Sequence, residues 1–236
     1  MKLLTCLFML IGFGILSAEP AFEAKVYRQG TAREELLFYH HNQRVVEGEM
    51  EIRRHFYLLP DSTVANIDEV VLESGEFSRS KAQFLQVDQI GEVIRRGERM
   101  ILRYSEDSNT KEREMDYPPD LLVGPLFNEH IIKHWSKLIE GEKLYFKLPA
   151  ADVQRVATFT FRRVEKSDYE EPGNIVFRLD VASIFLKLFV KSSYFVYDET
   201  DKLLQSIHGA SILPTRQDGK WQKTTDVDIY YSYPER

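Results

Sequence analysis

Cysteine is almost absent from this chain of 236 residues, since its one cysteine, Cys6, lies in an apolar run near the N-terminus. A disulfide framework is therefore excluded, and the chain must be held together by a packed core. A chain of this length can form one large core.

An excess of positive charge is also missing. The 31 Lys and Arg residues are outnumbered by 37 Asp and Glu residues, which gives a formal net charge of −6. Nucleic-acid-binding proteins present basic faces, and polybasic segments are what anionic membranes attract. We therefore predict no nucleic acid among the partners.

Recognisable catalytic motifs are missing as well. The chain has no Gly-x-Ser-x-Gly elbow and no glycine-rich phosphate loop followed by Lys-Ser/Thr. Acidic pairs such as Asp226/Asp228 and Glu170/Glu171 could serve a glycosidase, but solvated strands and loops carry such pairs too. We therefore predict no catalytic residue, no metal site and no cofactor, and treat a hydrolase as the least favoured alternative.

The apolar run at the N-terminus is short for a membrane anchor. Lys2 precedes an uncharged, mostly apolar stretch from Leu3 to Leu16, and Ser17-Ala18 offers small residues at a cleavage site. A spanning helix needs about 20 apolar residues. We therefore predict a signal peptide over residues 1–18, cleavage after Ala18, and a periplasmic or secreted protein without an integral membrane span. No cysteine follows the predicted cut, so lipidation is not expected.

Alternation of apolar and polar residues dominates the remaining chain. It is typical of antiparallel strands with one side on a core and one side in water. The alternating stretches are 49–58, 143–148, 158–162, 174–181 and 226–231. We interpret the polar stretch 105–120 as an exposed loop. The pattern is alike on both sides of it, so residues 19–236 are predicted to form a single domain.

One helix is predicted over residues 125–140. Pro125 suits the first helical position, and Gly141 suits the position just after the last. Phe127, Ile131 and Trp135 fall at helical spacing on a broad apolar stripe. In a β protein, such a stripe indicates a helix packed on the concave side of the sheet.

The histidines give weak indications of a site. His130 and His134 are four residues apart, a spacing that two metal ligands can have, but catalytic zinc needs three protein ligands. We favour half-exposed side chains that edge the apolar stripe. His40 and His41 are adjacent on a predicted strand and must face opposite sides, so we interpret them as ordinary surface or edge residues.

Residues 184–190 form an almost continuous apolar run, Ile-Phe-Leu-Lys-Leu-Phe-Val. A buried core strand or a short core helix explains this run. Alternatively, its side chains line an interior cavity, because aromatic-rich apolar walls are common in ligand pockets. The predicted apolar pocket consists of Phe127, Ile131, Trp135, Phe185, Leu188 and Phe189.

Local sequence features in the second half resemble the lipoprotein-carrier-like (LolA/LolB-like) periplasmic superfamily, and more closely uncharacterised exported bacterial families near it. These features are Val123-Gly124-Pro125 with Trp135 and Gly141, the Phe159 and Phe161 strand, and the stretch from Tyr194 to Ser211. The resemblance covers residues 120–233 and implies a curled antiparallel sheet around a helix and an apolar ligand.

We therefore predict a mainly β (α+β) fold, in which a curled antiparallel sheet or incomplete barrel carries one long helix on its concave face. The favoured function is noncatalytic binding or carriage of an apolar, lipid-like molecule in the cell envelope. An interaction or assembly module without a small ligand is the alternative, and a hydrolase is less favoured. The sequence does not predict the oligomeric state.

Overall fold

The computed structural model describes residues 21–183, 191–217, 219–222 and 225–234. A first meander consists of β1 (Glu23–Arg28), β2 (Leu36–Glu47), β3 (Met50–Leu58), β4 (Val64–Glu73), β5 (Glu76–Phe84), β6 (Gln89–Arg96), β7 (Arg99–Glu106) and β8 (Asn109–Asp116). A helical segment follows, with η1 (Gly124–Leu126), α1 (Phe127–Lys133) and α2 (Trp135–Ile139). The remaining strands are β9 (Leu144–Ala150), β10 (Arg155–Val164), β11 (Asn174–Val181), β12 (Ser193–Asp198), β13 (Leu204–Ser211), β14 (Thr215–Gln217), β15 (Lys220–Gln222) and β16 (Thr225–Ser232).

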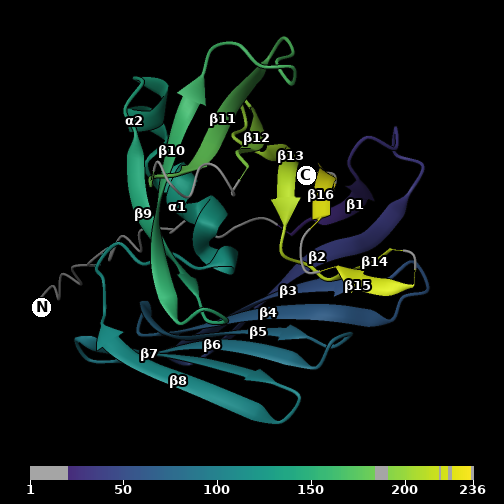
Figure 1. The fold of residues 1–236 in the computed structure, drawn as a ribbon. Coiled ribbons are helices and arrows are strands. Elements are labelled where there is room, and N and C mark those ends of the chain that lie inside the picture. The colour runs from purple at the N-terminus through teal and green to yellow at the C-terminus, as the bar shows by residue number, and fades with distance from the viewer. Residues whose placement is uncertain (1–20, 184–190, 218, 223–224, 235–236) are drawn as a thin grey trace, which may run out of the picture.

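Fourteen of these strands form one antiparallel sheet, in the order β8-β7-β6-β5-β4-β3-β2-β1-β16-β13-β12-β11-β10-β9. The last strand, β16, pairs with β1 and with β13, so it joins the meander β1–β8 to the meander β9–β13 (Figure 1). The sheet is not closed into a barrel. The prediction of a mainly β protein with an open antiparallel sheet is confirmed.

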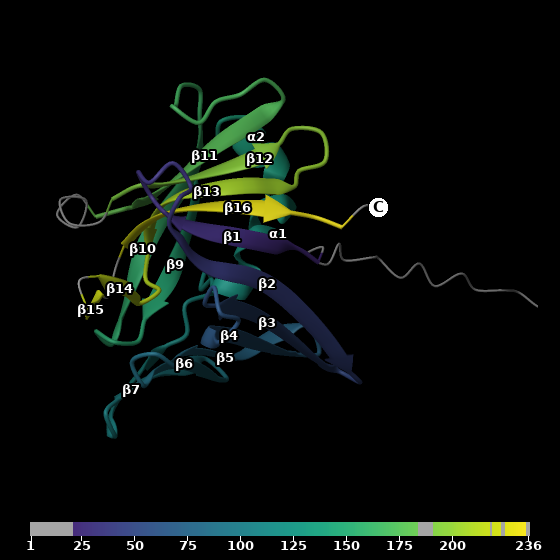
Figure 2. The ribbon, with the colours of Figure 1, turned by 90° about the vertical axis from the view of Figure 1, so that its right-hand side faces the viewer.

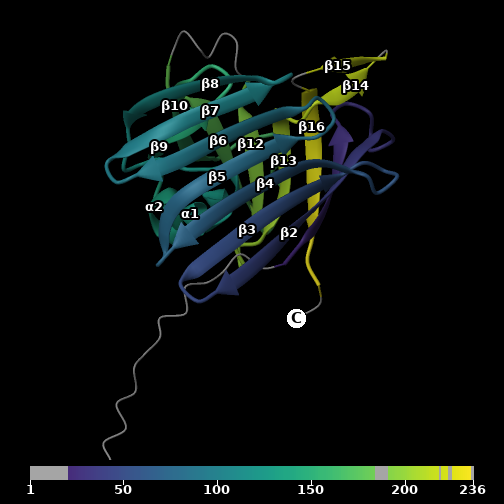
Figure 3. The same ribbon diagram turned by 90° about the horizontal axis from the view of Figure 1, so that it is seen from below.

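The sheet bends sharply, so that its two halves form two layers. Figure 2 shows β2 turning away from the layer of β1, β16 and β13, and Figure 3 shows β3–β8 crossing over the strands of the other half. The turn between β9 and β10 reaches the opposite layer, where Arg113 Nη1 donates to the Gln154 carbonyl oxygen at 3.2 Å. A methyl group at Gly91 would lie 3.4 Å from Ala151 Cβ, so a small residue permits this approach. We call the faces that the two layers turn toward each other the inner face.

The prediction of a loop over residues 105–120 is wrong for most of that stretch. Residues 109–116 form the edge strand β8, which pairs with β7 along its whole length. Its charged side chains form ion pairs with the neighbouring strand: Glu114 pairs with Arg99 of β7, and Glu112 pairs with Arg103 of β7. Charged edge strands resist pairing with other chains, so this stretch has a loop-like composition although it is a strand.

The long helix predicted over residues 125–140 is also wrong, because the segment divides into three short pieces. The break lies at His134, whose φ of −106° and ψ of 16° are not helical. Pro125 does lie in the first turn of the segment, and Gly141 follows its end with a φ of +88°. Each piece is too short to be stable alone, so contacts with the sheet must hold the segment in place. Among the described residues, no helix has the length and apolar character needed to cross a membrane.

Candidate functional site

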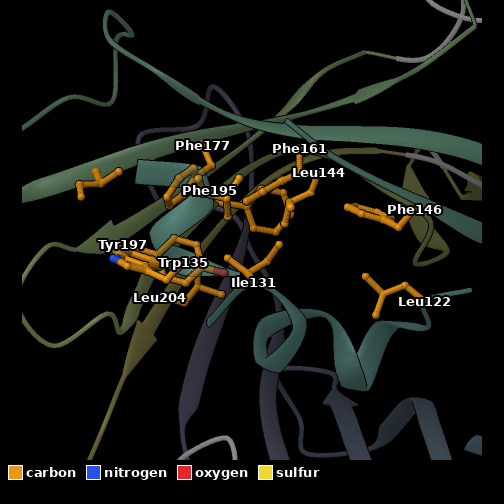
Figure 4. Close-up of a cluster of buried hydrophobic side chains, with 12 residues drawn as sticks. Leu122, Ile131, Trp135, Leu144, Phe146, Phe161, Phe177, Phe195, Tyr197 and Leu204 are labelled. Carbon is orange, nitrogen blue, oxygen red and sulfur yellow. The ribbon is translucent and has the colours of Figure 1, made fainter. Parts of the chain in front are cut away.

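The helical segment packs against the inner face of β9–β13 and fills one end of the space between the layers. Ile131, Trp135 and Leu138 are buried there among aromatic side chains of the sheet. Figure 4 shows Ile131 and Trp135 within this cluster. The Trp135 ring lies 5.4 Å from that of Phe177 and 5.5 Å from that of Tyr197. Two of the predicted pocket residues, Ile131 and Trp135, therefore belong to a packed cluster.

The helical segment leaves part of the apolar inner face uncovered. Five apolar side chains at the border of the packed cluster are only partly buried, four of them on the inner face of the sheet and one in α1. They are Phe127, Leu148, Phe159, Leu179 and Ile207. We call them the inner apolar strip. The predicted pocket residue Phe127 is one of them, and its ring stacks on Phe195 at 5.1 Å.

The other predicted pocket residues, Phe185, Leu188 and Phe189, lie outside the described residues. The strip therefore consists of one predicted pocket residue and four further side chains from β9, β10, β11 and β13.

The opposite layer turns polar side chains inward. His40, His55, Asn66 and Asp68 come from three neighbouring strands, β2, β3 and β4, and the strand register places them on one face. We call them the inner polar cluster. In β3, the side that carries Arg53 and His55 is the buried side, whereas its apolar side chains lie on the outer face and are partly exposed. The expected orientation, with the apolar side on a core, is therefore wrong for this strand.

His40 is the most unusual member of the cluster. It is only 3% exposed, and among the described residues neither of its ring nitrogens has a hydrogen-bond partner. Its ring stacks on Tyr57 at 4.2 Å and meets the edge of Phe22 at 4.8 Å. Burial, together with the nearby imidazole of His55, holds the pKa of His40 well below its ordinary value. The ring is therefore neutral at pH 7, with one nitrogen that donates and one that accepts.

Asn66 and Asp68 complete this polar surface. The Asn66 amide nitrogen donates to Asp68 Oδ1 at 3.0 Å, whereas Asn66 Oδ1 is buried without a partner. Burial raises the pKa of Asp68 above its ordinary value, although the Asn66 hydrogen bond acts in the opposite direction. The prediction that His40 is an ordinary surface residue is wrong, because cross-strand pairing brings it into an interior polar group.

An ion-pair network connects the polar layer to the helical segment. Arg53 forms ion pairs with Glu51 in its own strand and with Glu129 in α1. Arg44 also contacts Glu51, at 2.8 Å and 2.9 Å. The two guanidinium groups are thus balanced by two carboxylates, so this network adds no net positive charge to the inner face.

A second polar group lies on the outer face. His208 Nε2 is 2.8 Å from Ser206 Oγ, and His208 Nδ1 is 2.7 Å from Asp228 Oδ1. This is the hydrogen-bond order of a nucleophilic serine triad. However, Ser206 is only 7% exposed and lies in a central strand, where the ladder directs its backbone N–H to a neighbouring strand. The Tyr169 ring lies flat on His208 at 3.9 Å. We interpret the group as a structural link between β13 and β16.

The two histidines of the helical segment lie close together, with ring centroids 4.5 Å apart. Burial and the neighbouring His134 lower the pKa of His130 to about 4. Within the described part of the chain, no group of three or more His, Cys, Asp or Glu side chains is placed to hold a metal ion.

An apolar side chain is exposed on the small hairpin β14–β15. Trp221, in β15 itself, is 40% exposed. A surface pocket of about 290 Å³ lies here, lined by Val87, Gln89, Glu106, Pro214, Trp221 and Gln222.

Comparison of the chain with family models, curated proteins and solved structures found no match. The resemblance to the lipoprotein-carrier-like superfamily therefore stays a prediction, and function must be argued from the geometry of the site.

Proposed function

We propose that the chain is a noncatalytic protein of the cell envelope that binds or carries an apolar, lipid-like molecule on its inner face. The observation behind this proposal is the inner apolar strip. Four of its side chains project from β9, β10, β11 and β13 on the inner face, and Phe127 of α1 packs beside them; all five are less completely buried than the cluster next to them. Each methylene that a ligand buries there contributes about 0.8 kcal/mol.

The open sheet supplies the physical reason for such a site. The sheet is not closed into a barrel, and the helical segment leaves the inner apolar strip only partly buried. Apolar surface in a protein interior is normally close-packed or occupied. The resemblance of residues 120–233 to exported carrier proteins agrees with this proposal, as does the predicted signal peptide.

Native mass spectrometry of the protein purified from the periplasm, with organic extraction, tests the proposal. We expect an apolar adduct that is lost in Phe159→Glu, with Leu179→Ser as a milder second variant. Tyr145→Asp is the matched control, because Tyr145 is 59% exposed. A bare protein mass that is unchanged after incubation with membrane lipids would refute the proposal.

An interaction module is the second candidate function. The exposed Trp221 and the surface pocket that it lines support it, because exposed apolar patches mark protein-interaction sites. If Trp221→Ser abolishes capture of an envelope protein while lipid extraction finds no ligand, this second function replaces the first.

A further inference from the structure

The inner polar cluster contains buried hydrogen-bonding atoms that the fold itself does not use. Both ring nitrogens of His40 and the side-chain oxygen of Asn66 are buried without partners among the described residues. Leaving such atoms unpaired costs free energy, and buried polar groups in native proteins nearly always have a partner. Three unpaired atoms on one inner face therefore indicate a missing polar partner.

The position of these atoms relates them to the proposed ligand. His40, Tyr57 and Asn66 follow one another across β2, β3 and β4, so the unpaired atoms flank the Tyr57 ring. Tyr231 connects the two layers, because its ring is 6.0 Å from His40 and its side chain packs against the apolar cluster of β9–β13. A ligand on the apolar strip would thus have one end directed toward the polar cluster.

The chemistry of the inner polar cluster restricts which polar group the ligand can direct toward it. A neutral imidazole offers one donor and one acceptor, and the Asn66 oxygen offers an acceptor. The guanidinium groups of Arg44 and Arg53 are already paired with Glu51 and Glu129. An anionic headgroup would therefore have to lose its water without an unpaired guanidinium from either arginine to replace it, which is unfavourable.

We propose that His40 and Asn66 bind the uncharged polar end of an amphiphilic ligand, such as the hydroxyl of a long-chain alcohol or of a monoacylglycerol. This inference rests on the proposed function, because it requires that a ligand binds at the inner face. It adds selection of the headgroup by hydrogen bonding to selection of the tail by the apolar strip.

Displacement of the neutral fluorescent probe N-phenyl-1-naphthylamine by ligands with the same eighteen-carbon tail tests the inference. We expect oleyl alcohol to bind about 10–100-fold more tightly than octadecene or oleate, because a site with buried polar groups rejects analogues that leave them unpaired. His40→Phe should remove this preference while octadecene still binds. His40→Gln, which keeps a donor and an acceptor, should restore part of it.

The unliganded protein gives an independent measurement. Phenylalanine can stack on Tyr57 as the imidazole does, so His40→Phe should unfold at an equal or higher urea concentration than the parent protein. If His40→Phe does not fold, Asn66→Leu must show the loss of headgroup preference instead.

The possible failures are distinguishable. Equal affinity for all three ligands in the parent protein would overturn the inference and leave the proposed function standing. A crystal structure with saturating oleyl alcohol in which His40 contacts ordered water only would also overturn it. If neither the probe nor any ligand binds, the proposed function itself fails.

Discussion

Gly209 in β13 gives the sharpest test of how closely β13 packs against β12. Its φ is +153°, and a Cβ at this position would lie 2.4 Å from Ser193 Oγ and 2.8 Å from Ser193 Cα. Because one of these atoms belongs to the backbone, rotation of the serine side chain cannot remove the overlap. Overpacking costs about 1–3 kcal/mol, and a strained backbone conformation adds about 1–3 kcal/mol.

We therefore expect Gly209→Ala to lower the free energy of unfolding by about 2–6 kcal/mol. With a urea m-value of about 2–3 kcal/mol/M for a chain of this size, the midpoint should fall by about 1–3 M, as measured by circular dichroism. Gly91→Ala is the matched control, because its Cβ would make an ordinary contact at 3.4 Å. Its midpoint should change by less than about 0.5 M.

A double variant separates the clash from the strain. Ser193→Gly removes two of the three atoms that the new methyl group would meet, so it should recover part of the loss caused by Gly209→Ala. If Gly209→Ala unfolds at the same urea concentration as the parent protein, the close approach of β12 and β13 at this point is wrong.

Three further predictions concern His130, Asp68 and Ser206. The pKa of His130 is lowered to about 4 in the folded protein, so protonation favours the unfolded state as the pH falls below about 6.5. Between pH 7 and pH 5 the parent protein should lose up to about 2 kcal/mol relative to His130→Gln in urea unfolding, and equal losses would contradict the shift. The raised pKa of Asp68 has the opposite sign, because its burial disfavours the ionised form as the pH rises. Asp68→Asn should therefore stabilise the protein at pH 7 and have a smaller effect at pH 4, provided that the Asn66 hydrogen bond is kept. Ser206 should not react with a fluorophosphonate probe, whereas Ser206→Ala should lower the melting temperature. Stoichiometric labelling that is lost in His208→Gln would make the group catalytic.

Local sequence patterns were sufficient for the coarse fold. Alternation with a period of two follows from the geometry of a strand, so it identified strands such as β9, β11 and β16 before any tertiary contact was known. Pro125 and Gly141 marked the two ends of the helical segment because their backbone preferences are local. The opposite orientations of His40 and His41 followed from the same geometry.

The inner face could be assigned only from the tertiary structure. In β3 the alternation correctly indicated two sides, but it favoured the apolar side as the buried one. The side that carries Arg53 is buried instead, because Glu129, a residue 76 positions away, pairs with Arg53 in the interior. The strand β8 was missed for the same reason, since its ion pairs with β7 outweigh its loop-like composition.

The inner polar cluster shows most clearly that the burial of a residue depends on the tertiary structure and not on local sequence. Nothing in the stretch Tyr39-His40-His41 distinguishes a buried histidine from an exposed one. The sequence by itself indicated strands where apolar and polar residues alternate, because alternation depends on neighbours along the chain. Only the bending of the sheet decided that His40, Asn66 and the inner apolar strip share one interior, because that depends on how strands far apart in the sequence pair and fold over one another.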